Sequence, residues 1–135
     1  MIKLTDILKE YNITSPSSFP TKDDMIELIN GAYVFGVGIT YLYITSLSKL
    51  NDVADKLGRD EYGDEWNNFE AEDKEANIIF YKASEQLAEQ LKEYLSKMNI
   101  KSEIMDDHSD YGGVIYSLLE ISTSDFNRLK EKFKK

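Results

Sequence analysis

The feature that most constrains the fold is a run of 21 residues without a charged side chain, from Leu28 to Ser48. A helix of this length could cross a membrane. The run, however, contains three glycines and four Ser or Thr residues, and its larger side chains are mainly Tyr, Val and Ile. That composition is typical of strands. We therefore expect buried and half-buried strands here, and no membrane partner.

Residues 32–45 alternate between two faces in the way a strand requires. Tyr33, Phe35, Tyr41 and Tyr43 fall on one bulky face. Fourteen residues would make an unusually long strand. The segment Gly36–Gly38 therefore predicts either a tight hairpin or a bulge.

Apolar spacings of three and four residues predict helices at 4–11, 21–31, 46–58, 84–98 and 124–135. Further strands are predicted at 77–83, 101–106 and 114–121. The segment 77–83 is apolar on both faces, which favours a central strand. Together with the helix at 84–98, it predicts a right-handed parallel crossover over residues 77–106.

These elements predict an α+β fold of two layers. One mixed, mostly antiparallel sheet would carry helices on one face, with ferredoxin-like layering, preceded by two short N-terminal helices. We expect residues 1–31 to form the helical segment and residues 32–135 the α+β domain, within one folding unit. Such an architecture by itself carries no function.

Charge and composition bound the function classes. The net charge of −9 disfavours direct nucleic-acid binding, since phosphates require clustered Lys and Arg. The chain has no cysteine, so disulfides and thiolate chemistry are excluded. The first residues lack a signal peptide's apolar core, which predicts a cytoplasmic location. Abundant Lys, Ile, Asn and Tyr with scarce Arg is typical of the AT-rich genomes of many bacteria and phages.

Few residues suggest catalysis or metal binding. Asp106, His108 and Asp110 resemble part of a metal loop, but neither register of the segment matches a calcium loop. A polar hairpin turn explains the same residues. Gly36 and Gly38 lack the third glycine of a dinucleotide loop. The single histidine and absent cysteine leave no usual nucleophilic triad. We therefore expect no cofactor and no enzyme activity.

The acidic segment 60–75 is the remaining candidate for function. Tyr62, Trp66 and Phe69 recur at helical spacing. The neighbouring acids at the start of the segment are Asp60, Glu61, Asp64 and Glu65. The aromatics could pack on the domain's own core, or they could be exposed anchors for a partner while the acids steer a basic surface.

We adopt the second interpretation as the working hypothesis: a non-catalytic protein-interaction module, an inhibitor or adaptor, that binds a protein with a basic surface. One alternative is a small-molecule-binding regulatory domain that uses the face of Tyr33, Phe35, Tyr41 and Tyr43. The other is a self-assembling structural or virion component, in which sheet edges pair to form a homo-oligomer.

Overall fold

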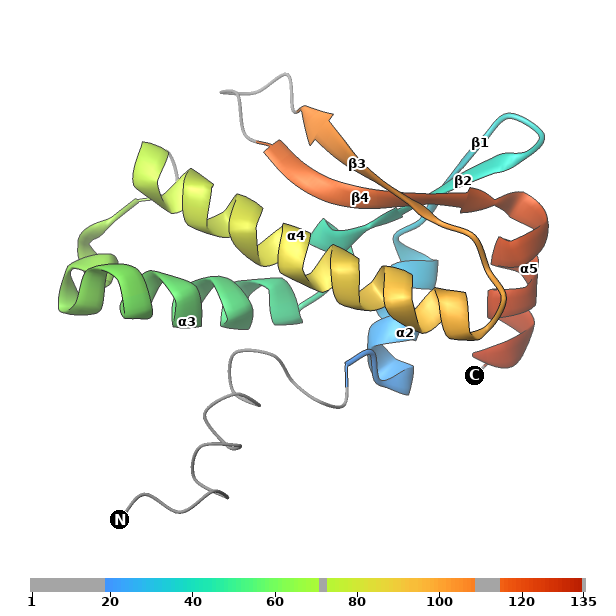
Figure 1. Ribbon diagram of the computed structural model, residues 1–135, viewed down its shortest axis with the longest axis horizontal. Helices are drawn as coiled ribbons and strands as arrows, with labels where there is room; N and C mark the ends of the chain where they lie inside the picture. Colours follow the sequence, from blue (N-terminus) through green and yellow to red (C-terminus); the bar gives the residue numbers. More distant parts are fainter. Residues whose placement is uncertain (1–18, 71–72, 109–114, 135) are drawn as a thin grey trace, which may run out of the picture.

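The structure, a computed structural model, describes residues 19–70, 73–108 and 115–134 (Figure 1). Its helices are α2 (Lys22–Asn30), α3 (Lys49–Tyr62), α4 (Lys74–Lys97) and α5 (Thr123–Lys132). Its strands are β1 (Tyr33–Phe35), β2 (Ile39–Tyr43), β3 (Glu103–His108) and β4 (Ile115–Ser122). Two 3₁₀ turns, η1 (Ile44–Ser46) and η2 (Gly63–Asn68), complete the described elements. The helix expected at residues 4–11 lies outside them.

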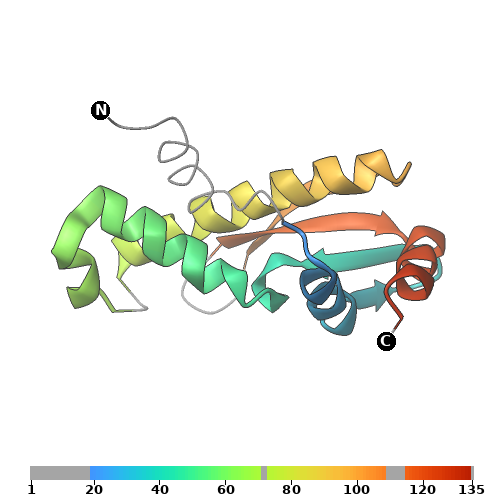
Figure 2. The ribbon, with the colours of Figure 1, turned by 90° about the horizontal axis from the view of Figure 1, so that it is seen from below.

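The four strands form one antiparallel sheet in the order β1-β2-β4-β3. The helices lie below this sheet in Figure 1, and Figure 2, seen from below, shows α2 and α3 in front of the strands. The expected two-layer α+β sandwich with helices on one face is therefore confirmed. No helix in the described ranges is both long enough and apolar enough to span a membrane.

The element order repeats itself. A helix, a hairpin and a second helix follow one another as α2-β1-β2-α3, and again as α4-β3-β4-α5. The second strands of the two hairpins, β2 and β4, pair with each other at the centre of the sheet. The glycines singled out in the sequence form the first hairpin: Gly36 has a φ of 63°, which glycine adopts without the steric cost that a Cβ brings. A hairpin, and not a bulge, therefore interrupts residues 32–45.

The strand expected at 77–83 is wrong, because these residues belong to α4. The buried positions of the helix include Ala76, Ile79, Ala83, Leu87 and Leu91, spaced by three or four residues without a break. This stripe packs against β4 and α3. The segment looked like a central strand because Ile78 and Phe80 also make its second face apolar. Without that strand there is no parallel crossover among the described elements.

Ser84, at which the predicted helix 84–98 begins, lies inside α4. Its hydroxyl is fully buried and donates to the carbonyl of Tyr81 at 2.8 Å. The same oxygen accepts the backbone N–H of Ser117, in β4, at 3.0 Å. This hydroxyl thus joins the middle of the long helix to the sheet.

Trp66 is part of the core. Its side chain is 7% exposed, and the indole Nε1–H donates to the carboxylate of Asp55 at 3.1 Å. The expected end of the third helix at Gly58 is wrong, because α3 continues to Tyr62. Gly58 has a different role: a Cβ there would overlap the Trp66 ring. The helix ends where Gly63, with a φ of 61°, reverses the chain and brings the indole back onto α3.

Replacing Trp66 by Ala should therefore cost about 3–5 kcal/mol of unfolding free energy, the range for removing a large buried aromatic. Urea denaturation followed by circular dichroism would measure the loss. Asn67→Ala, at the exposed neighbouring position, is the control and should change the free energy by less than about 0.5 kcal/mol. Equal stabilities of the two variants would contradict the enclosed position of the indole.

Ser84→Ala should cost about 1–3 kcal/mol, because the buried N–H of Ser117 would be left without its acceptor. The same denaturation experiment measures this effect. Ser96→Ala, on an exposed turn of the same helix, is the matched control. A neutral Ser84→Ala would show that the N–H finds another acceptor.

Candidate functional site

The acidic segment does not present its aromatic residues as an outward-facing surface. Trp66 is buried, and the half-buried rings of Tyr62 and Phe69 pack against the same core. Tyr62 and Phe69 meet edge to face with centroids 4.9 Å apart, and Phe69 meets Trp66 at 5.9 Å. The expectation of exposed anchors is therefore wrong: the turn at Gly63 folds the three rings back onto the domain. The acids Asp60, Glu61, Asp64 and Glu65 are exposed around them.

The loop singled out for metal binding lies mostly outside the described residues. These exclude Asp110 altogether and the side chain of His108. The Asp106 carboxylate accepts a hydrogen bond from the Tyr81 hydroxyl at 3.1 Å, which ties α4 to β3. Burial raises the pKa of the Tyr81 phenol, and the carboxylates of Asp106 and Glu85 raise it further. Within the described side chains, no three His, Cys, Asp or Glu residues could hold one metal ion.

The face of the sheet opposite the helices, the open face, is the strongest candidate surface. The register puts Tyr33, Tyr41, Glu120 and Glu103 side by side across the four strands. Directly opposed residues of antiparallel strands share a face. The neighbouring rows on the open face contain Phe35, Ile39 and Ser122 on one side, and Tyr43, Leu118 and Met105 on the other.

The four aromatics predicted to share a face, Tyr33, Phe35, Tyr41 and Tyr43, do share it. We call them the aromatic platform. Tyr33 is 53% exposed and Phe35 55% exposed, while Tyr41 and Tyr43 are half-buried. The rings of Tyr33 and Phe35 have centroids 6.3 Å apart, and those of Phe35 and Tyr41 6.2 Å. The rings of Tyr33, Phe35 and Tyr41 thus form a continuous aromatic surface on the first hairpin.

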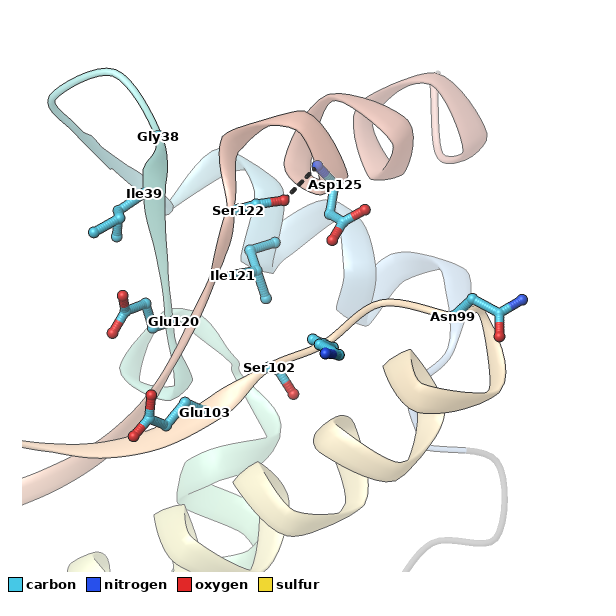
Figure 3. A pocket seen from close by; sticks show the side chains of 10 residues that line it. Gly38, Ile39, Asn99, Ser102, Glu103, Glu120, Ile121, Ser122 and Asp125 are labelled. Atoms are coloured by element: carbon cyan, nitrogen blue, oxygen red, sulfur yellow. Dashed lines mark hydrogen bonds between the residues drawn. The ribbon is translucent and has the colours of Figure 1, made fainter.

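A pocket of about 710 Å³ opens where β3 and β4 diverge. Pairing between the two strands begins at Glu103 and Glu120, so the chain leading into β3 separates from Ile121 and Ser122. Figure 3 shows Ile39, Glu103 and Glu120 pointing to one side of the sheet, and Ile121 and Ser102 to the other. We call this the splay pocket. Its carboxylates are those of Glu103, Glu120 and Asp125, and its single cation is Lys101.

A second hollow, of about 460 Å³, adjoins the splay pocket and contains no acid. Its lining residues are Lys92, Ser96, Asn99, Ile100, Lys101 and Ser102. We call it the lysine groove. Sequence reasoning missed this groove, although one signal was present: the stretch from Tyr94 to Ser102 has no acid in a chain of net charge −9.

Residues 69–134 match the model of a family described as LAGLIDADG-like domain. This range spans α4, β3, β4 and α5, the second of the two helix–hairpin–helix units. The nonapeptide that the family's name spells in one-letter code does not occur in the chain. Neither a search of curated proteins nor one of solved structures found a match.

This match overturns the functional expectations drawn from the sequence. The family is one of homing endonucleases and maturases, which act on nucleic acid. A non-catalytic protein-interaction module is therefore the wrong class, and so are its two alternatives. The expectations of no enzyme activity and of no direct nucleic-acid contact are also wrong, because such domains bind DNA and typically cleave it. The net charge was a poor guide to nucleic-acid contact, because it sums over an acidic end of the molecule and a region without acids.

The open face and the core should respond differently to truncation. Tyr33→Ala and Phe35→Ala should each cost less than about 1 kcal/mol, the value of a cross-strand pair. Leu42→Ala, on the helix-covered face of β2, should cost about 2–5 kcal/mol. Urea denaturation of the three variants measures both effects. A large drop in the unfolding free energy of Phe35→Ala would show that the platform stabilises the fold.

Proposed function

We propose that this protein binds nucleic acid, and that the aromatic platform on the open face stacks against unpaired bases. The match of residues 69–134 supports nucleic acid as the ligand. The exposure of Tyr33 and Phe35 supports the aromatic platform as the contact site, and this exposure is the observation that carries the proposal. A cytoplasmic location is part of the same proposal.

The platform has the properties that base stacking requires. Aromatic rings left in water on a sheet provide flat apolar surfaces, and every base has a π-face that can stack on them. Of the six large apolar side chains that are exposed in the described chain, four lie in the first hairpin, namely Tyr33, Val34, Phe35 and Val37. Such a concentration of exposed apolar surface marks a binding site.

The charges of the open face favour unpaired bases over an intact duplex. A duplex presents its phosphates outward and conceals the π-faces of its bases within the stack. The side chains assigned above to the open face include no Lys or Arg, and two of them, Glu103 and Glu120, are acidic. This face would therefore repel a row of phosphates. A single-stranded nucleic acid with splayed bases can instead contact the aromatic platform at the β1 side of the sheet, away from the two acids.

The test is fluorescence anisotropy with a labelled single-stranded DNA of about twenty nucleotides, a length that covers the site size of typical single-strand binders. The single strand should bind more tightly than the matched duplex. Phe35→Ala and Tyr33→Ala should each weaken binding by about 5- to 150-fold, equivalent to 1–3 kcal/mol per stacked base.

Ile78→Ala is the matched control, because Ile78 is also an exposed apolar residue, at 43%, but lies on α4. Its affinity should equal that of the wild type. The proposal fails if the wild-type protein binds neither single strand nor duplex. If Tyr33→Ala or Phe35→Ala binds the single strand as tightly as the wild type, the aromatic platform is not the contact site.

A further inference from the structure

We infer that the lysine groove is the site for a backbone phosphate of the same nucleic acid, held by Lys92, Lys101 and the hydroxyl of Ser102. This inference rests on the proposed function. It supplies what the open face lacks, namely cationic groups for the strand whose bases contact the aromatic platform.

The groove forms because the chain reverses sharply after α4. The helix ends at Lys97, and Asn99 then adopts a φ of 62°, a left-handed conformation that asparagine tolerates better than most residues. Ile100 is buried and anchors the turn in the core. Lys101 and Ser102 then run past the last turns of α4 on the way to β3. The side chains of Lys92 and Ser96, four residues apart on the helix, form the facing wall.

Among the described residues, neither lysine of the groove has an ionic partner. In the described part of the chain, no carboxylate oxygen lies within 4 Å of the ammonium of Lys92 or Lys101, whereas Lys49, Lys56, Lys97 and Lys134 each have one. In a chain of net charge −9, two unpaired cations on one hollow without acids make a local positive site. Such a site favours an anion.

The hydroxyl of Ser102 adds a second, independent observation. Its oxygen is buried and has no hydrogen-bond partner among the described residues. A buried hydroxyl without a protein partner is costly, and a ligand oxygen or a water that reaches it from the hollow would supply that partner. In Figure 3 its side chain points toward α4. A phosphate oxygen there could accept a charge-assisted hydrogen bond from the hydroxyl.

The groove is continuous with the open face. Asn99, Lys101 and Ser102 line both the lysine groove and the splay pocket. The splay pocket in turn reaches Ile39, which stands opposite Phe35 of the aromatic platform. A single-stranded nucleic acid whose bases stack on the platform can therefore pass into the lysine groove. The carboxylates of the splay pocket repel phosphate, so the groove is where a phosphate is accepted.

The experiment measures single-stranded DNA affinity as a function of salt for the double variant K92Q/K101Q. For every phosphate that the variant no longer neutralises, the slope of log K against log salt should fall in magnitude by about 0.7. We expect a shallower slope and, at low salt, an affinity about tenfold or more weaker. Ser102→Ala should weaken binding without changing the slope by as much, because it removes no charge.

K82Q is the matched control, because Lys82 is an exposed lysine of α4 without an ion pair in the described chain, ten residues before Lys92. It should keep the wild-type slope. Thermal denaturation checks that all variants fold. If the wild type binds but K92Q/K101Q keeps its slope and affinity, the groove is not a phosphate site and the proposed function stands. If the wild type binds no nucleic acid, the proposed function and the groove fall together.

Discussion

The packing of α4 across the sheet is the contact on which the rest of the structure depends. One apolar stripe of this helix, from Ala76 to Leu95, contacts both α3 and β4. Because β4 is central, this stripe holds the two hairpins in one sheet and leaves the opposite face uncovered. Burial of such a stripe is favourable in proportion to the apolar area that it removes from water. The buried hydroxyl of Ser84 adds a directional contact that sets how the helix lies on β4.

The two faces of the sheet therefore have different roles. Leu42, Leu119 and Ile121 on the covered face are buried beneath the helices. The open face carries the aromatic platform, whose outermost rings contribute little to the core. A cluster of exposed apolar side chains is typical of a ligand site, and the family match of residues 69–134 makes nucleic acid the ligand that we propose.

Charge is separated along the molecule, and this separation makes the proposed polyanionic ligand compatible with an acidic protein. The turn η2, which carries exposed acids, lies beside the start of α4 (Figure 1). The lysine groove lies at the other end of the same helix. Salt screens charges over about 8–10 Å, so a phosphate in the groove responds to the groove's own lysines more than to the distant acids. The net charge is thus a poor guide to what one region of the surface can bind.

The sequence by itself determined the two-layer α+β class, a helix that begins near residue 21, a break in residues 32–45 at the glycine pair and the aromatic face of the first hairpin, because apolar spacing, alternation and glycine conformation are local properties. Only the tertiary structure decided that residues 77–83 extend α4, since a short apolar run fits a buried helix as well as a central strand. It also decided that Trp66 is enclosed, because the chain reverses at Gly63 and Gly58 leaves room for the ring. The lysine groove brings together two segments around a turn, and its unpaired lysines and buried hydroxyl are properties of their surroundings in space, which no spacing along the chain reveals.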